Sequence, residues 1–406
     1  YITMGGGLMQ LVAYGAQDIY LTGNPQITFF KVVYRRHTNF SMECIRQDGI
    51  GGSNRSWIIS RNGDLILNVY LQLNTINNHT EKLSQNSTKW EGKYADLENI
   101  LENVKYIIEI GGQTIDKFTE KYRRIHNSLF EFNPTNEDCI ISSAKFVKNS
   151  IINIPFWFCR TPGCALPLIA LQYHEVKIST ENLTYMFHSD ILTNLDLWCT
   201  YVYLDTDERR RFAQVSHEYL IEQIQYTTVP HNTNIELNFN HPVKELMWIF
   251  NVNKPWGVKP YVNNDWATND KFGLQLNGQD RFDPRHPNYF SDWQINKYHT
   301  GYGKILLEDN DYTYSFGSGG PESHDNPAHR GQVYRGDVYV YSFALKPEEH
   351  QPSGTCNFSR IDSATLQLNY SGKPYPIDKS DTITIFAKNY NILRIMSGMG
   401  GLAYSN

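Results

Sequence analysis

Long apolar runs, clusters of basic residues and closely spaced cysteines are all missing from this sequence. No stretch approaches the roughly 18 apolar residues of a membrane-spanning helix, and the first residues lack the charged-then-apolar layout of a signal peptide. Lys and Arg total 37 against 42 Asp and Glu, so the net charge is -5, and no basic run offers a surface for nucleic acid. These absences favour a soluble, unsecreted protein that does not bind nucleic acid directly.

The cysteines are too few and too scattered to form a disulfide framework. Only Cys159 and Cys164 lie close together in the sequence. We therefore expect free core thiols in a reducing compartment for all six, which are Cys44, Cys139, Cys159, Cys164, Cys199 and Cys356.

Motifs of known catalytic sites are also absent. The sequence has no phosphate-binding loop, no GxSxG and no HExxH, and His324 with His329 is too sparse a pair to hold zinc. We therefore predict no catalytic residue, no metal site and no cofactor. One alternative is a carbohydrate-binding or carbohydrate-cleaving β-sandwich, in which a carboxylate pair lies beside sugar-stacking Trp residues. The favoured interpretation is that these aspartates form turns; they are Asp265, Asp270, Asp280, Asp283, Asp292, Asp309 and Asp311.

Aromatic residues are abundant, with 27 Tyr, 20 Phe and 8 Trp among 406 residues, and they favour β-strands over helices. In the segment 64–74, Leu65, Leu67, Val69, Leu71 and Leu73 alternate with other residues, which predicts a strand with one apolar face. The same period recurs over 235–239, 366–370 and 383–387. The segments 197–204 and 338–345 are apolar on both faces and predict central strands. An all-β protein follows from these patterns.

Turns and helices complete the prediction. Gly111-Gly112 predicts a two-residue hairpin. Helical spacing over 91–104, and over 119–132 after a Thr119 cap, predicts short helices set into loops. A third helix is expected over 206–214, with Thr206 as the cap and acidic residues in the first turn, and it marks the domain boundary.

The two halves of the chain share an outline. The segment 57–74 has a counterpart at 234–252, and 197–204 has one at 382–390, both offset by about 180 residues. We therefore predict two tandem eight-stranded antiparallel jelly rolls with a few short helices in loops. The expected parts are an N-terminal arm (1–24), a first jelly roll (25–205), a linker with a short helix (206–216) and a second jelly roll (217–406).

A region of about 253–333 shows little alternation and is rich in Gly, Pro, Asn, Asp and aromatic residues. Loops of this length in a compact domain are usually functional or disordered. The aromatic content favours ordered, packed loops, so we expect a projecting surface feature.

Seven Asn-x-Ser/Thr sequons occur, at Asn39, Asn54, Asn78, Asn86, Asn182, Asn357 and Asn369. Asn54, Asn78 and Asn86 lie in polar, loop-like stretches and are the candidate glycan acceptors. Asn369 lies inside an alternating strand and is the least suitable acceptor. Near the N-terminus, three glycines precede a short apolar stripe of Leu8, Leu11 and Val12, which is either an arm that docks on a partner or a first turn packed on its own domain.

The segment 5–40, GGGLMQLVAYGAQDIYLTGNPQITFFKVVYRRHTNF, resembles the start of the major capsid proteins of nucleocytoplasmic large DNA viruses, in particular the phycodnavirus and mimivirus-like group. The resemblance continues through 60–66, 203–225, 237–248, 347–369 and 389–406. It covers both halves and both ends, and leaves 75–200 and 253–333 mostly without family motifs. Tyr1-Ile2-Thr3 precedes Met4, so the true start is open.

The resemblance implies a double jelly roll and a structural function. By this implication the protein forms homotrimeric, pseudo-hexagonal capsomers that contact neighbouring capsomers in an icosahedral virion shell assembled in the host cytoplasm. The N-terminal arm would face minor capsid proteins and the internal membrane, with the long loops of the second half outside. We expect 253–333 and 206–216 to contribute to contacts between subunits. A minor or vertex capsid paralogue would share these motifs and stays open as an alternative.

Overall fold

The protein is described from a computed structural model. The residues that the structure describes are 8, 13, 15–25, 34, 36–73, 103–130, 151–183, 195–251, 266–301, 303–308, 333–369 and 382–404. By contacts the chain divides into two units, Tyr1–Asn39 and Phe40–Asn406. In the first unit α2 (Ile19–Thr22) is one exposed turn, before which Asp18 accepts the N–H of Gly15 at 2.7 Å. Among the described residues, no helix has the length and apolar character needed to cross a membrane.

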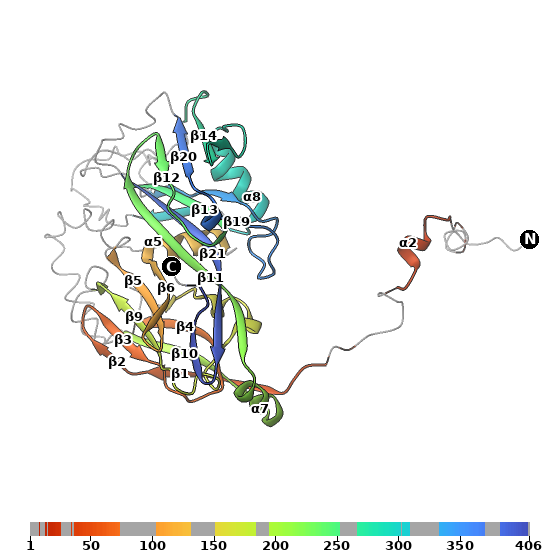
Figure 1. The fold of residues 1–406 in the computed structure, drawn as a ribbon, viewed down its shortest axis with the longest axis vertical. Coiled ribbons are helices and arrows are strands. Elements are labelled where there is room, and N and C mark those ends of the chain that lie inside the picture. The colour runs from red at the N-terminus through yellow and green to blue at the C-terminus, as the bar shows by residue number, and fades with distance from the viewer. Residues whose placement is uncertain are drawn as a thin grey trace, which may run out of the picture. The chain divides into compact units, whose positions relative to one another are not determined.

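The first half of the larger unit forms a sandwich of two antiparallel sheets, drawn in orange and yellow in Figure 1. One sheet has the order β1-β10-β4-β7, with β8 also paired to β4, and the other has the order β2-β3-β9-β5-β6. Two 3-10 turns, η2 (Trp157–Cys159) and η3 (Pro162–Cys164), precede β8. The strands are β1 (Phe40–Gln47), β2 (Gly49–Gly51), β3 (Arg55–Ile58), β4 (Leu65–Leu73), β5 (Lys105–Ile110), β6 (Gln113–Thr119), β7 (Ile151–Asn153), β8 (Leu166–Pro167), β9 (Val176–Glu181) and β10 (Leu195–Leu204).

The second half forms another sandwich, drawn in green to blue in Figure 1. One sheet has the order β11-β21-β13-β18, joined by β19 and β22, and the other has the order β12-β20-β14-β15. The strands β16 (Lys304–Glu308) and β17 (Val333–Asp337) form a separate ribbon. The other strands are β11 (His217–Pro230), β12 (Asn234–Glu236), β13 (Pro242–Asn251), β14 (Lys271–Leu276), β15 (Gln279–Asp280), β18 (Tyr339–Ser342), β19 (Cys356–Asn357), β20 (Ala364–Asn369), β21 (Thr382–Met396) and β22 (Met399–Leu402).

The two sandwiches repeat one strand order. The sheet β1-β10-β4-β7 corresponds to β11-β21-β13-β18, and β3-β9-β5-β6 corresponds to β12-β20-β14-β15. In both halves the first strand pairs with a long strand near the end of that half, β1 with β10 and β11 with β21, which is the arrangement that two Greek keys give in a jelly roll. The predicted pairs of segments are the equivalent strands: β3 and β4 match β12 and β13, and β10 matches β21. The prediction of two tandem antiparallel jelly rolls is confirmed.

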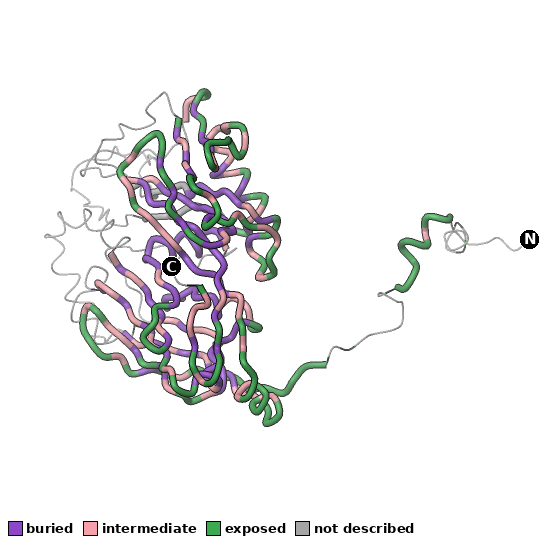
Figure 2. Tube along the Cα trace, viewed as in Figure 1, coloured by how far each residue is buried: buried purple, intermediate pink, exposed green. Residues whose placement is uncertain are grey.

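The sandwiches share a hydrophobic core. The largest buried cluster includes Val69, Leu71 and Tyr106 of the first half together with Phe386 and Leu393 of β21. A second cluster lies within the second half, around Trp248 and Phe272. Figure 2 shows buried stretches of chain where the second sandwich meets the first. Because apolar area removed from water stabilises a fold in proportion to its extent, the shared core joins the halves into one body.

Several local predictions are confirmed. The hairpin between β5 and β6 turns at Gly111 and Gly112, whose φ angles of 58° and 82° suit glycine. The predicted alternation over 235–239 is present, with Ile235, Leu237 and Phe239 buried between exposed residues. Five cysteines are free thiols, namely Cys44, Cys159, Cys164, Cys199 and Cys356, whereas Cys139 lies outside the described residues. The prediction of core thiols is wrong for Cys44, which is exposed on β1.

The uniform alternation predicted for 64–74 is wrong at one point. The pairing of β4 with β10 shifts between Thr200 and Tyr201, so Leu67 is an extra, bulged residue. Before the bulge, Ile66 enters the main core, while Leu65 and Leu67 join a small cluster with Phe212. A bulge moves the following residues to the opposite face of the sheet, and the hydropathy pattern does not predict where a bulge occurs.

The placement predicted for 338–345 is also wrong. In the described sheet β18 stands at the end of the order β11-β21-β13-β18, rather than at its centre. Its residues are nevertheless buried throughout, because the π-helical turn η5 (Tyr289–Trp293) and α8 (Gln294–Tyr298) contact it. An edge strand that is covered by a helix can be apolar on both faces, so its sequence resembles that of a central strand.

The region 253–333 is only partly loop. Within it β14 and β15 belong to the second sandwich, and Phe272, Leu274, Phe290 and Ile295 are buried. The prediction of long surface loops is therefore wrong for 271–298, because Gly273 and the polar residues of β14 conceal the strand period. The prediction of ordered, packed aromatic residues is confirmed for Trp266, which donates to the Tyr339 hydroxyl at 3.0 Å, and for the buried Phe272 and Phe290. It is wrong for Trp293, which is 61% exposed.

The helix predictions are right in extent where they can be compared. α7 spans Thr206–Gln214 with Asp207 and Glu208 in its first turn, but Asp205 is the N-cap residue, so the cap predicted for Thr206 is wrong. α5 spans Glu120–Phe130, and Thr119 accepts the N–H of Tyr122 at 3.4 Å as its cap. The helix predicted over 91–104 lies almost entirely outside the described residues.

Candidate functional site

The sequence predicts neither a catalytic site nor a metal site. Within the described residues, no three His, Cys, Asp or Glu side chains are grouped so as to hold a metal ion. Among the aspartates of the carbohydrate alternative, Asp270 is fully buried and accepts the N–H of Ala267 at 2.8 Å. Asp270 thus stabilises a turn, as the favoured interpretation predicts.

The structure covers one of the three candidate glycan acceptors. Asn54 lies between β2 and β3 and is exposed, and its Oδ1 accepts the N–H of Asn182 at 2.9 Å. Asn78 and Asn86 lie outside the described residues. Asn54 is therefore accessible to solvent, and its role as a glycan acceptor stays a prediction.

The feature most unlike an ordinary β-sandwich is α5, a charged helix that is buried. The sequence predicts a short helix set into the loop after β6, and in the structure every residue from Glu120 to Leu129 is buried. Lys121 Nζ contacts Thr384 Oγ1 of β21 at 3.4 Å, and Tyr122 packs against Phe386 of the same strand. The helix therefore lies between the sandwiches, a position that the sequence pattern did not predict.

Burial of α5 is tolerated because its charges are paired. The Glu120 carboxylate accepts from Arg123 Nη2 at 2.7 Å, from Arg124 Nε at 3.0 Å and from the Tyr106 hydroxyl at 2.8 Å. Burial alone would raise the pKa of Glu120, but the two guanidinium groups outweigh it and lower the pKa to about 2. The carboxylate is therefore ionised and holds both arginines in the interior.

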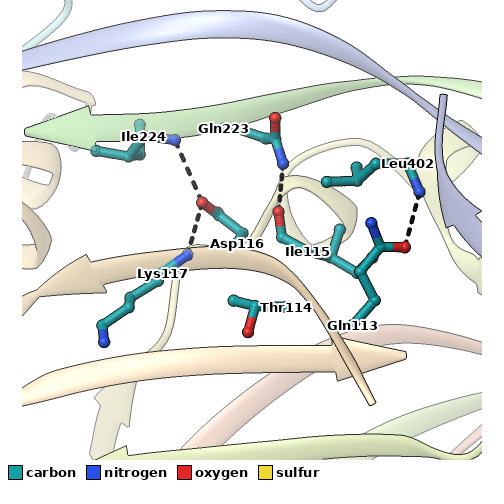
Figure 3. A pocket seen from close by; sticks show the side chains of 8 residues that line it. All are labelled: Gln113, Thr114, Ile115, Asp116, Lys117, Gln223, Ile224 and Leu402. Carbon is teal, nitrogen blue, oxygen red and sulfur yellow. Dashed lines mark hydrogen bonds between the residues drawn. The ribbon is translucent and has the colours of Figure 1, made fainter. Parts of the chain in front are cut away.

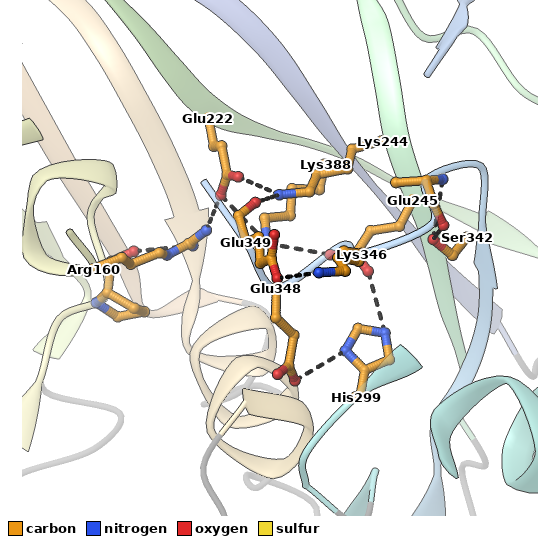
Figure 4. Close-up of polar contacts among 12 residues, drawn as sticks. Arg160, Glu222, Lys244, Glu245, His299, Ser342, Lys346, Glu348, Glu349 and Lys388 are labelled. Atoms are coloured by element: carbon orange, nitrogen blue, oxygen red, sulfur yellow. Dashed lines mark hydrogen bonds and ion pairs between the residues drawn. The ribbon is translucent and has the colours of Figure 1, made fainter. Parts of the chain in front are cut away.

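A second buried group of charges, which we call the ionic seam, joins the two sandwiches (Figure 4). Its centre is Glu222 on β11, which pairs with Arg160 of the first sandwich, with Lys244 Nζ at 2.5 Å and with Lys388 Nζ at 3.3 Å. Lys388 Nζ also lies 3.2 Å from a Glu245 oxygen. One carboxylate is thus surrounded by three cations from separate elements.

Arg160 carries the seam into the first sandwich. It directly follows η2, and its Nη2 donates to the Tyr122 hydroxyl of α5 at 3.2 Å and to the Pro155 carbonyl at 3.3 Å. Burial would raise the pKa of Glu222, but Lys388, Arg160 and Lys244 outweigh it and hold the pKa below its ordinary value. Burial lowers the pKa of Lys388 to about 8. Since ion pairs constrain geometry more than apolar contacts do, the seam favours one relative position of the sandwiches.

The ionic seam is not among the features predicted from the sequence, although the chain contains a signal for it. Lys388 interrupts the apolar run TITIFAKNYNIL, and Glu222 and Glu245 stand in the apolar strands β11 and β13. Charged residues are rarely buried unless they are paired. Isolated charges in the middle of apolar strands therefore predict buried partners, but the sequence does not identify which ones.

A cavity of about 410 Å³ lies where β6 faces β11 (Figure 3). Asp116 Oδ1 accepts the N–H groups of Lys117 at 3.0 Å and of Ile224 at 3.2 Å, and Gln223 donates to the Ile115 carbonyl. Burial raises the pKa of Asp116 to about 7. The residues that line the cavity are Gln113, Thr114, Ile115, Asp116, Lys117, Gln223, Ile224 and Leu402.

Comparisons with known proteins agree with this architecture. A family model for the major capsid protein N-terminus matches residues 28–205, and one for the large eukaryotic DNA virus major capsid protein matches 208–330 and 325–401. The major capsid proteins of Pyramimonas orientalis virus and Paramecium bursaria Chlorella virus 1 are 48% and 40% identical to this chain, and each match covers 99% of this chain and 100% of the relative.

A solved structure resembles the chain over nearly its whole length. The quasi-atomic model of the PBCV-1 virus capsid matches with a TM-score of 0.67 and 35% identity, covering 93% of this chain and 100% of that one. Sequence identity at this level, extending over both jelly rolls, supports common function as well as common fold. The chain belongs to the family of large eukaryotic DNA virus major capsid proteins, and it is a structural protein of a virion shell.

Proposed function

We propose that three copies of this chain form a homotrimeric, pseudo-hexagonal capsomer that tiles an icosahedral shell. The observation that supports this proposal is the repeated strand order of the two sandwiches within one chain. Three subunits related by cyclic symmetry present six similar sandwiches, which approximates a hexagon. We further propose 25–205 and 217–406 as the bounds of the two jelly rolls, with 206–216 between them.

A capsomer of this kind needs a rigid subunit. The shared core and the ionic seam both oppose sliding of one sandwich on the other, because any displacement would separate Arg160 from Glu222 in a buried environment. The geometry therefore supports a subunit in which the two sandwiches move as one rigid body, more than a pair of hinged domains.

The remaining contacts of the proposed capsomer follow from the family. We propose that the arm at 1–24 faces minor capsid proteins and the internal membrane, that neighbouring capsomers pack side by side, and that assembly occurs in the host cytoplasm. We also propose that 253–333 and 206–216 contribute to contacts between subunits. In these segments Trp293 is 61% exposed and Val215 is 53% exposed, as expected for apolar contact residues.

Sedimentation velocity and light scattering at micromolar concentration test the trimer. We expect a mass of three times the 47.0 kDa of one chain, and six-sided particles in negative-stain micrographs. A monomer at this concentration would overturn the proposed capsomer, because obligate interfaces of about 2,000 Å² or more do not dissociate there.

A pair of variants tests the placement of the contacts. Trp293→Ser removes an exposed aromatic side chain from the proposed contact region, whereas Tyr173→Ser removes one that is 74% exposed outside it. We expect the first variant to weaken the trimer and the second to leave it intact. A trimer unaffected by Trp293→Ser would reject that residue as a contact while leaving the trimer itself in place.

A further inference from the structure

His299 lies between two carboxylates at one end of the ionic seam. It is the C-cap residue of α8, and its backbone N–H donates to the Ile295 carbonyl at 2.8 Å, which fixes the backbone from which the ring extends. Its Nε2 lies 3.3 Å from a Glu245 oxygen, and its Nδ1 lies 3.6 Å from a Glu348 oxygen. The imidazole is fully buried (Figure 4).

The groups around His299 come from four elements. Glu245 is on β13, Lys388 is on β21, Glu348 lies in the loop after β18, and the Phe130 ring of α5 meets the imidazole edge-on at 5.2 Å. Only a protonated imidazole has two N–H groups and a positive charge, so only this form suits carboxylates on both sides. Burial would lower the pKa of His299, but Glu245 and Glu348 outweigh it and raise the pKa.

Loss of the proton affects the two carboxylates differently. Glu245 keeps Lys388 at 3.2 Å. Glu348 keeps only the hydrogen bonds from the Thr300 N–H at 2.7 Å and the Thr300 hydroxyl at 3.1 Å, and no other cation is paired with it among the described residues. Deprotonation of His299 therefore weakens the attachment of Glu348 more than that of Glu245.

Glu348 belongs to a compact loop, Leu345–Ser353, that contacts both sandwiches. The loop ends meet where Lys346 N–H donates to Ser353 Oγ at 2.9 Å. Lys244 Nζ of the second sandwich donates to the Glu349 carbonyl at 3.0 Å, and Cys164 Sγ of the first sandwich lies 3.0 Å from His350 Nε2. The loop therefore covers one end of the seam.

We propose that His299 is a proton-operated latch: when charged it holds the loop Leu345–Ser353 on the seam, and when neutral it lets the loop open. A group whose pKa is raised by folding stabilises the folded state fully at pH values below its ordinary pKa, which is 6.5 for this histidine. That stabilisation is lost as the pH rises through the raised pKa. The loop is thus closed below pH 6.5 and opens as the pH rises through the raised pKa of His299. The latch operates within one chain and does not depend on trimer formation.

Hydrogen exchange of the full chain, followed by mass spectrometry of peptides spanning 345–353 from pH 6 to pH 9, tests the latch. After correction for the intrinsic pH dependence of exchange, we expect wild-type protection to fall by about tenfold for each unit by which folding raises the pKa of His299. His299→Gln should show low protection with no such slope. His37→Gln, the same change at an exposed histidine, should match the wild type.

A second variant separates the latch from a purely structural role. Glu348→Gln keeps an acceptor for Thr300 but removes the charge that faces His299, and this side chain is 25% exposed, so the change is mild. We expect it to abolish the pH-dependent part of protection. Lys388 and Asp116 are present in both the variant and the wild type, so subtracting the protection of one protein from that of the other removes the effect of their titration. An equal slope in the wild type and either variant would overturn the proposal.

Discussion

Arg160 of the first sandwich and Glu222 of the second form an ion pair across the seam, with only 20% and 7% of their side chains exposed. The pair joins segments 62 residues apart in sequence, and Lys244 and Lys388 complete the surroundings of the carboxylate. Glu222 is therefore the carboxylate that Arg160, Lys244 and Lys388 share, and Lys388 has Glu245 as a second partner.

Glu222→Gln should destabilise the protein strongly. Glutamine keeps the size of the side chain, but three buried cations lose their shared anion, and removing one partner of a buried pair costs about 3–5 kcal/mol. Urea unfolding measures this loss. Glu218→Gln on the same strand is the control, because the Glu218–Arg394 pair is more than half exposed and contributes about 1 kcal/mol or less. Equal losses in the two variants would show that the seam contributes no special stability.

Asp116→Asn should stabilise the protein at alkaline pH relative to acidic pH. Folding raises the pKa of Asp116 from 3.8 to about 7, so the folded state binds the extra proton between these values, and stability falls as the pH rises through them. Asparagine retains an oxygen for the N–H groups of Lys117 and Ile224 without the charge.

We expect the gain of Asp116→Asn over the wild type to reach on the order of 4 kcal/mol at pH 8 and to be below about 1 kcal/mol near pH 4. Urea unfolding at both pH values measures it. Asp280→Asn, at an exposed position, should show no such dependence. A gain that is the same at both pH values would contradict the assignment.

Gly111→Ala should cost more than Gly112→Ala, although both glycines have positive φ. The strain of this backbone conformation costs about 1–2 kcal/mol at either site. A Cβ at Gly111 would also lie 2.3 Å from His174 Nδ1, whereas one at Gly112 meets nothing within 4 Å. Overpacking adds about 1–3 kcal/mol at Gly111 alone. Thermal unfolding of the two variants tests the order, and equal losses would reject the collision.

Asn54 should carry a glycan if the virion protein is modified at sequons that the structure describes. It is exposed in a loop, whereas Asn369 is paired with Lys271 inside a sheet. Glycopeptide mass spectrometry of protein from virions locates the modification, and Asn54→Gln should remove it. Unmodified Asn54 in particles that carry a glycan on Asn369 would reverse this expectation.

Strand periods and turn residues in the sequence predict much of the fold. Alternation at Ile235, Leu237 and Phe239, the glycine pair at 111–112 and the repeat of segments between the halves all depend on near neighbours in the chain. Such local patterns predict the double jelly roll without knowledge of any long-range contact. The position of α5 and the strand β14 are missed, because burial of a charged helix and recognition of a short polar strand depend on partners far away.

The sequence by itself determined the strand segments, the duplication and the family, because alternation and motif order are written along the chain. Only the tertiary structure decided which charges meet. Glu222 meets Arg160 only where the two sandwiches pack together. Lys388 and His299 meet their carboxylates only where separate elements of the second sandwich pack together, and a buried charge needs such a partner. Residue patterns specify elements, whereas the pairing of buried charges is specified by the assembled fold.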